Sequence, residues 1–280
     1  MIIVNNPTST AAGKNYFKNP NFAVIQGTAS GTLANSLALP TASLGYLGET
    51  EWCIAASGGT PAYAFSTLDE RVTFTGAAST TAIYLLQRLE SLDTNRLKNK
   101  TVTFSCEISN SLLTSVIWEV FRPTTTDNAH GTIATPTQTL VASGTFTVNS
   151  TLTRYSATFA LPDLASRGLE VRLRVGAQTS GTWVVSRLQL EEGSTATNFN
   201  CDDFSQELFK ARRYYYAATL YVGQVALYLT THTFPNQMFA TPISIGGGAG
   251  YSAVLLNSNT LAHIQSTNAA QAFTFSAHIP

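Results

Sequence analysis

The chain is organised around residues 183–216, WVVSRLQLEEGSTATNFNCDDFSQELFKARRYYY. The first part of this stretch alternates with a period of two, which predicts a half-buried strand. The alternation places on one face Val184, Ser186, Leu188 and Leu190, and on the other Trp183, Val185, Arg187 and Gln189. Turn residues at 192–194 end the strand, so a β-domain is expected to close at about residue 200.

A short helix is predicted after that strand. Asp202 or Asp203 can accept backbone N–H bonds at the helix start, with Gln206 as the capping-box partner. Spacings of four, three and four then align one helical stripe, formed by Phe204, Leu208, Ala211 and Tyr215. The stripe suits either a trimeric seam between sister chains or docking onto the protein's own sandwich.

The composition favours β-sheets with hydroxyl-rich outer faces. Only 11% of the 280 residues are charged, against about a quarter in ordinary globular proteins. The net charge is zero, so the electrostatic footprint of a nucleic-acid binder is missing and no nucleic-acid partner is expected. So little charge gives a free monomer little colloidal protection, which favours an assembly that covers part of the surface.

Cysteine and histidine positions give no sign of a metal or a cofactor. Cys53, Cys106 and Cys201 are too scattered for a disulfide framework or a zinc site, and Cys106 is expected to be a small buried thiol. The N-terminus turns polar at Asn5, well short of a signal-peptide core, and no apolar run reaches transmembrane length. We therefore expect a protein that is made in a cytoplasm and does not insert into a membrane.

Regular alternation predicts strands along most of the chain. Up to residue 200 they are expected near 44–47 and at 52–56, 62–68, 71–75, 82–88, 101–109, 115–121, 138–148, 153–161, 169–176 and 182–191. Residues 92–97 suit either one helical turn or a loop. Further strands at 220–230, 238–245, 253–256 and 272–278 make a small β-rich tip. The predicted fold class is all-β: an antiparallel β-sandwich, a short helix and a β-rich tip.

Several phrases, taken in order, resemble bacteriophage tail-fibre and receptor-binding proteins with a carbohydrate-binding-module-like jelly roll. They are NYFKNPNF at 15–22, LKNKTVTFS at 97–105, RYSATFALP at 154–162, LQLEEGSTAT at 188–197, RRYYY at 212–216 and FPNQMFATP at 234–242. The match spans roughly residues 15–245. Residues 34–60 depart from the pattern, because they lack the aspartate- and tryptophan-containing segment that often follows the opening strand in the family.

The resemblance implies a homotrimeric virion protein, in a tail fibre or baseplate, made in the host bacterial cytoplasm. Its divisions would be an N-terminal arm (1–14), a carbohydrate-binding-module-like sandwich (15–200), a linking helix (201–216) and a tip (217–280). The arm is either a loose terminus or a tether to other phage tail or baseplate proteins. The implied function is host-surface recognition and adhesion through a cell-surface glycan. The alternative is a structural virion protein with no ligand of its own.

Sugar binding needs exposed aromatic faces beside planar hydrogen-bonding groups. Trp183 and Arg187 share one face of the predicted strand, and Arg172 and Arg174 could join them if their strands are neighbours. Trp183 could instead lie in the other half of the sandwich core, while Trp52 and Trp118 are expected in the core. At the tip, the candidate receptor contacts are Tyr221, Tyr228, His232 and Tyr251.

No enzymatic activity is expected. Glu191 and Glu192 are adjacent on a strand and point to opposite faces, so they cannot flank one glycosidic bond as acid and base. Asp202 and Asp203 fit a helix cap better than a catalytic pair. A depolymerase that degrades host capsule is therefore the least favoured hypothesis.

Overall fold

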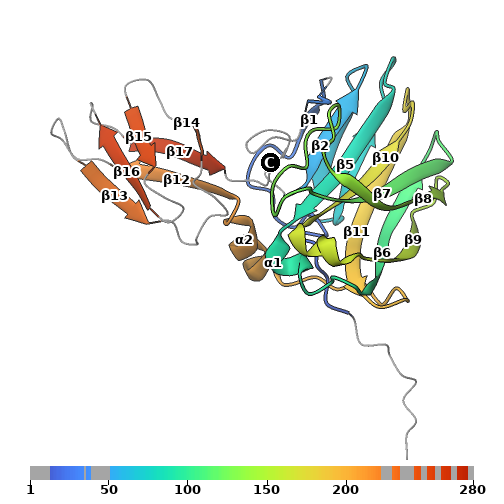
Figure 1. Cartoon of the computed structure of the whole chain (residues 1–280). Coiled ribbons are helices and arrows are strands. Elements are labelled where there is room, and N and C mark those ends of the chain that lie inside the picture. The colour runs from blue at the N-terminus through green and yellow to red at the C-terminus, as the bar shows by residue number, and fades with distance from the viewer. Residues whose placement is uncertain are drawn as a thin grey trace, which may run out of the picture.

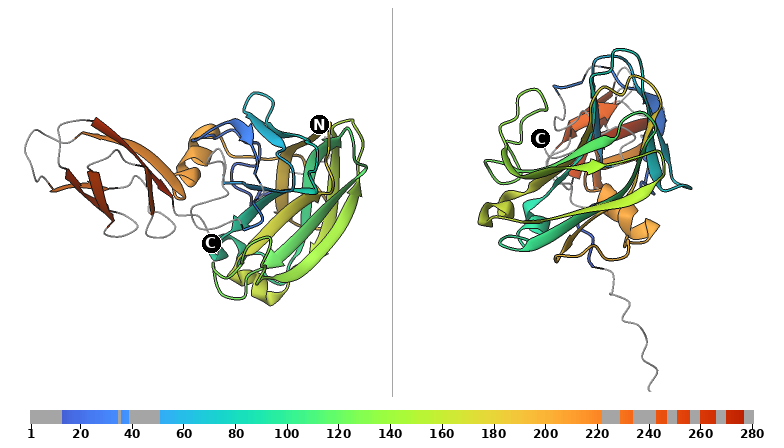
Figure 2. Two further views of the ribbon diagram at one scale, coloured as in Figure 1. Left: turned by 90° about the horizontal axis from the view of Figure 1, so that it is seen from above. Right: turned by 90° about the vertical axis from the view of Figure 1, so that its right-hand side faces the viewer.

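The computed structural model describes residues 13–34, 36–38 and 51–221, together with strands at 229–233, 243–246, 251–255, 260–265 and 270–276. Two antiparallel sheets pack on each other to form a sandwich (Figures 1 and 2). The six-stranded sheet has the order β1-β3-β4-β11-β6-β9 and the five-stranded sheet the order β2-β5-β10-β7-β8. The predicted antiparallel β-sandwich is confirmed.

Apart from β1, which was not predicted, the strands lie close to the ranges that the alternation predicts. The six-stranded sheet contains β1 (Ser30–Thr32), β3 (Ala62–Ser66), β4 (Arg71–Thr75), β6 (Thr101–Asn110), β9 (Thr153–Ala160) and β11 (Thr182–Glu192). The five-stranded sheet contains β2 (Cys53–Ser57), β5 (Ala82–Leu89), β7 (Ser115–Arg122), β8 (Thr139–Thr147) and β10 (Leu169–Val175). At the ends lie the single helical turn α1 (Ser91–Thr94) and a 3-10 helix (Asp163–Arg167). The strand expected near 44–47 lies outside the described residues.

The core forms between the inner faces of the two sheets. In β6 and β10 every second side chain points inward, as a strand packed on one side requires. The inward residues are Val102, Phe104, Cys106 and Ile108 in β6 and Leu169, Val171, Leu173 and Val175 in β10. Trp52, Trp118 and the Cys106 thiol lie in this core, as expected. Burial raises the pKa of the Cys106 thiol, which keeps it protonated at neutral pH.

A β-bulge in β11 makes the face assignment from the sequence wrong. Three steps along β11, from Ser186 to Gln189, match only two steps along β6, so β11 holds one extra residue there. Arg187 takes this position with a left-handed φ of 46°. The extra residue reverses the parity, so the core residues of β11 are Trp183, Val185, Leu188 and Leu190.

The N-terminal phrase NYFKNPNF closes one end of the sandwich. Phe17 and Phe22 are buried and pack against Trp52, with ring centroids 5.2 and 5.8 Å away. The Trp52 indole N–H donates to the Asn19 carbonyl at 2.9 Å, and the Asn19 side-chain amide bonds both to N and to O of Val24. Residues 15–22 are therefore part of the folded sandwich and not a flexible segment that precedes it.

The phrase LQLEEGSTAT folds back over the outer face of β11. Glu191 is buried and accepts hydrogen bonds from the Thr197 backbone N–H, the Thr197 hydroxyl and the Gln189 amide. Glu192 points the other way and pairs with Lys100 at 3.0 Å, both side chains being half exposed. The two carboxylates thus have structural roles on opposite sides, as their adjacency in the strand predicts.

Helix α2 (Phe204–Ala211) begins at the predicted cap: the Asp203 carboxylate accepts from the Gln206 N–H at 3.0 Å. The helix docks on the sandwich through buried Glu207, whose Oε2 accepts from the Asn19 N–H at 2.6 Å. It ends at residue 211, before the predicted limit of 216, and β12 (Tyr215–Tyr221) follows. Among the described residues no helix is long and apolar enough to cross a membrane.

Beyond α2 the described strands form two three-stranded antiparallel sheets, drawn beside the sandwich in Figure 1. One has the order β12-β17-β14, with β14 at Ile243–Gly246 and β17 at Ala270–Ser276. The other has the order β13-β16-β15, with β13 at Leu229–Thr233, β15 at Tyr251–Leu255 and β16 at Thr260–Gln265. The tip is β-rich as predicted, although β16 was not anticipated and one predicted strand divides into β12 and β13.

Candidate functional site

The outer face of the five-stranded sheet carries charged and aromatic side chains together. We call it the arginine face and define it by Arg88, Arg172, Arg174, Glu119, Glu170, Tyr84 and Phe121, from β5, β7 and β10. These positions alternate with the core residues of the same strands, so the period of two brings them onto one surface. The outer face of the six-stranded sheet carries threonine and serine from β4 and β6 together with charged side chains such as Arg187 and Glu107.

Glu170 is the centre of this face. Its carboxylate, wholly buried, receives Arg88 Nε at 2.9 Å and Arg172 Nη2 at 2.5 Å. Arg172 Nε and the Gln138 amide each donate a further hydrogen bond at 3.1 Å. Burial alone raises the pKa of Glu170, but the guanidinium groups of Arg172 and Arg88 outweigh burial and lower the pKa to about 2. The carboxylate is therefore ionised at neutral pH, and it fixes both arginines in place.

Arg172 is held between this carboxylate and two aromatic rings. Its guanidinium carbon lies 4.6 Å from the Phe121 ring centroid and 6.0 Å from that of Tyr84, within cation–π distance. Arg172 Nη1 and Arg174 Nε also lie 3.8 and 3.9 Å from the Glu119 carboxylate. The Arg174 side chain is 33% exposed, so it presents a positioned guanidinium to solvent.

The loop between β7 and β8 covers one side of the arginine face. The Gly131 carbonyl accepts from Arg88 at 2.6 Å, and Ile133 packs on Cys53 and Leu86. Buried His130 contacts the Gln138 side chain through Nδ1 at 3.2 Å. Burial and the nearby Arg88 lower the pKa of His130 to about 4, so the imidazole is neutral at pH 7. The loop does not cover Tyr84, Glu119 and Arg174, which are therefore partly exposed to solvent.

The structure separates the four predicted sugar-binding residues. Trp183 has no exposed surface and stacks on Phe74 at 4.7 Å, so its expected place on a binding face is wrong and the core alternative holds. Arg187 lies on the outer face of the six-stranded sheet and pairs with Glu70 and Glu107 at 3.1 and 3.5 Å. Because β10 belongs to the other sheet, Arg172 and Arg174 do not join Arg187.

Sequence reasoning did not select Tyr84, Phe121, Glu119 and Glu170. A signal was present in β10, where Glu170, Arg172 and Arg174 occupy alternate positions opposite the core residues. The partners on β5 and β7 could not be assigned in the same way, because strand order is not encoded in the local pattern.

The four residues of the predicted oligomer seam do not lie together on one exposed surface. Ala211 and Tyr215 are buried within the chain, and Tyr215 belongs to β12 instead of the helix, so these two residues do not lie on an open face. Leu208 is half-buried, and Phe204 is 58% exposed. The expected continuous stripe is therefore wrong, because the helix ends before its last member.

The tip candidates lie in different places. Tyr221 ends β12, whereas His232 and Tyr251 lie on β13 and β15 in the other sheet. His232 pairs with Leu261 and Tyr251 with Gln265, so the two are offset along β16. Tyr228 lies outside the described residues, as do residues 1–12 of the predicted arm. Within the described chain no group of three or more His, Cys, Asp or Glu residues is arranged to hold a metal ion.

Comparisons with solved structures return carbohydrate-binding modules and a phage tailspike domain. A family 4 carbohydrate-binding module is 15% identical, with 60% of this chain and 97% of that chain covered and a TM-score of 0.40. A family 61 module in complex with β-1,4-galactotriose is 12% identical, with 64% and 99% covered and a TM-score of 0.36. The enzymatically active domain of tailspike protein 4 from bacteriophage CBA120 is 13% identical, with 56% and 21% covered and a TM-score of 0.36. No protein-family model and no curated protein matches the chain.

Proposed function

We propose that the chain is a non-enzymatic tail-fibre protein of a bacteriophage virion, which binds host cell-surface polysaccharide through the arginine face. The sugar-binding part of this proposal rests on the grouping of Arg174, Glu119 and Tyr84 at the partly open side of that face, and the tail-fibre part rests on the resemblance of the phrases between residues 15 and 245. A pyranose ring offers an apolar C–H face surrounded by hydroxyl groups. Aromatic rings beside planar charged groups suit both parts of such a ligand.

The ion network gives this face the rigidity that weak ligands require. Glu170 holds Arg172, and Glu119 lies within 4 Å of both Arg172 and Arg174, so these guanidinium groups are positioned before a ligand arrives. Preorganised groups lose less side-chain freedom on binding, which leaves more of the interaction energy as affinity. A homotrimer with several fibres on each particle would then convert weak single sites into firm attachment.

The trimer is proposed from the low charge of the chain and from the exposed Phe204 on α2. Sedimentation equilibrium of the full chain measures the mass directly. A folded monomer at working concentrations would overturn this part of the proposal without affecting the glycan site.

The glycan site is tested by binding purified surface polysaccharide of host strains to the full chain. Arg174→Ala should weaken binding about tenfold, the scale of one lost charge-assisted hydrogen bond. Arg187→Ala is the matched control, because that side chain is also partly exposed but lies on the outer face of the other sheet. Equal loss in both variants would show that the polysaccharide does not bind specifically at the arginine face, and no polysaccharide binding by the native protein would favour the structural virion protein without a ligand. Release of reducing sugar would instead indicate a depolymerase.

A further inference from the structure

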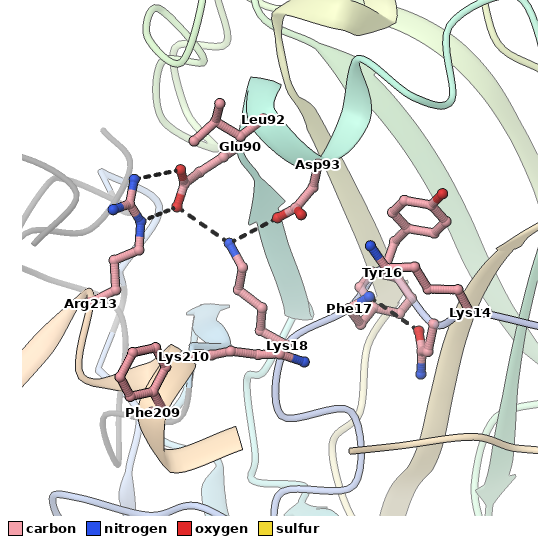
Figure 3. A pocket seen from close by; sticks show the side chains of 11 residues that line it. Lys14, Tyr16, Phe17, Lys18, Glu90, Leu92, Asp93, Phe209, Lys210 and Arg213 are labelled. Carbon is pink, nitrogen blue, oxygen red and sulfur yellow. Dashed lines mark hydrogen bonds and ion pairs between the residues drawn. The ribbon is translucent and has the colours of Figure 1, made fainter. Parts of the chain in front are cut away.

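A pocket of about 570 Å³ lies where three segments meet: the N-terminal segment, the β5–α1 corner and α2 (Figure 3). Its volume is within the range of small-ligand sites, roughly 300–1,000 Å³. The pocket is separate from the arginine face, since the two share none of their defining residues. We call it the junction pocket.

The floor of the junction pocket is a fixed ionic cluster. Glu90 accepts from Arg213 Nε at 3.0 Å and Arg213 Nη2 at 2.9 Å, and Lys18 Nζ lies 3.4 Å from Glu90 and 3.4 Å from Asp93. Lys18 also interacts with the Tyr214 ring, whose centroid is 4.5 Å from Nζ. Lys18 and Glu90 are buried, so these groups do not rearrange freely when a ligand enters.

The rim of the pocket is apolar and exposed. Phe209 on α2 is 63% exposed and Leu92 on α1 is 70% exposed, although both are large hydrophobic side chains. Figure 3 shows them on different segments that border the pocket. An exposed aromatic ring beside an ionic floor offers both the surfaces that a sugar ring can use.

The charges around the junction pocket nearly balance, and the one cation of its lining without a carboxylate partner among the described residues is Lys14. The lining contains four cationic side chains, Lys14, Lys18, Lys210 and Arg213, against two carboxylates, Glu90 and Asp93. Lys18 and Arg213 are matched by those carboxylates, and Lys210 by Asp202 and Glu207. The Lys14 ammonium contacts the Tyr16 ring, 4.7 Å from its centroid, and has no carboxylate partner within the part of the chain that the structure describes.

We propose that the junction pocket binds an acidic saccharide, whose carboxylate pairs with Lys14 and whose apolar ring face packs on Phe209. The choice of a saccharide rests on the proposed function, whereas the preference for an anion rests on the Lys14 ammonium, which contacts the Tyr16 ring and no carboxylate of the described residues. Because α2 forms one wall of the junction pocket and the sandwich forms the other, the bound sugar also holds α2, the helix that leads into β12, against the sandwich.

The test compares a tetrameric oligogalacturonate with its carboxyl-reduced neutral counterpart by titration calorimetry on the full chain. The acidic sugar should bind at least about tenfold more tightly, as expected for one charge-assisted contact. Lys14→Gln should remove that preference, and Phe209→Ala should weaken both sugars. Neither change removes a buried side chain, so both variants are expected to fold.

Two matched controls keep the result specific. Lys98→Gln removes another exposed lysine, and Leu68→Ala removes another exposed large hydrophobic side chain, yet neither residue lines the pocket. Both should bind like the native chain. Equal affinity for the two sugars, no binding of either, or unchanged binding after Lys14→Gln would overturn the inference. Loss with Arg174→Ala instead of Lys14→Gln would place the acidic sugar on the arginine face and keep the proposed function intact.

Discussion

Glu170→Gln tests the physical basis of the arginine face. The substitution keeps the size of the side chain but removes the charge to which Arg88 and Arg172 are paired at 2.9 and 2.5 Å. All three side chains are almost completely buried, so the arginines cannot turn to water without opening the β7–β8 loop. The variant therefore leaves uncompensated positive charge inside the protein.

The expected cost at pH 7 is large. Removing one partner of a buried ion pair destabilises proteins by about 3–5 kcal/mol, because the remaining charge stays desolvated. The lowered pKa of Glu170, converted to a free energy of unfolding by thermodynamic linkage, gives a cost of similar size. The pKa of Glu170 falls from its ordinary 4.5 to about 2 in the folded protein, and at about 1.4 kcal/mol for each pH unit this amounts to about 3 kcal/mol.

The sign of the pH dependence follows from the lowered pKa. A carboxyl group that is more acidic in the folded state stabilises the fold above pH 4.5 and loses that contribution as the pH falls toward 2. The native protein and Glu170→Gln should therefore differ most above pH 4.5. Their free energies of unfolding should converge near pH 2, where Glu170 itself becomes protonated.

Urea denaturation at a series of pH values, followed by tryptophan fluorescence, measures this difference. Glu192→Gln is the control, because Glu192 forms a half-exposed pair with Lys100 and should cost less than about 1 kcal/mol. A cost below about 1 kcal/mol for Glu170→Gln at pH 7, or a difference that does not change with pH, would refute the assigned role of the buried network.

Three further results are expected. Trp183→Ala should destabilise the sandwich by about 3–5 kcal/mol in the same denaturation assay, because the side chain is wholly buried; a cost near zero would contradict its core position. Gly144→Ala should lower the melting temperature, since a Cβ there would lie 2.7 Å from the Trp118 ring, a contact that costs about 1–3 kcal/mol to relieve. Gly176→Ala, which meets nothing within 4 Å, should leave the melting temperature almost unchanged. In the native protein a thiol reagent should modify Cys201 first, because Cys201 is only partly buried whereas Cys53 and Cys106 are fully buried, although burial raises the pKa of all three thiols; equal rates for all three would show that the core opens readily.

Local alternation was sufficient to find every described strand of the sandwich except β1 (Ser30–Thr32). Period-two patterns placed β4 at its observed limits and most other sandwich strands within one or two residues of theirs. The helix cap, narrowed to Asp202 or Asp203, and the core positions of Trp52, Trp118 and Cys106 could be predicted in the same way, since each depends on nearby residues or on one strand's own periodicity.

Only the tertiary structure decided which side chains meet. The extra residue at Arg187 becomes apparent only when β11 is aligned with its partner strand β6. It places Trp183 in the core and Arg187 on the outer face of the sheet. The division of β10 and β11 between two sheets separates Arg172 and Arg174 from Arg187 and brings them to Tyr84 and Glu119. A strand's periodicity is a property of its own residues, whereas register, bulges and neighbours depend on the partner strand, and the binding surfaces of this protein depend on those partners.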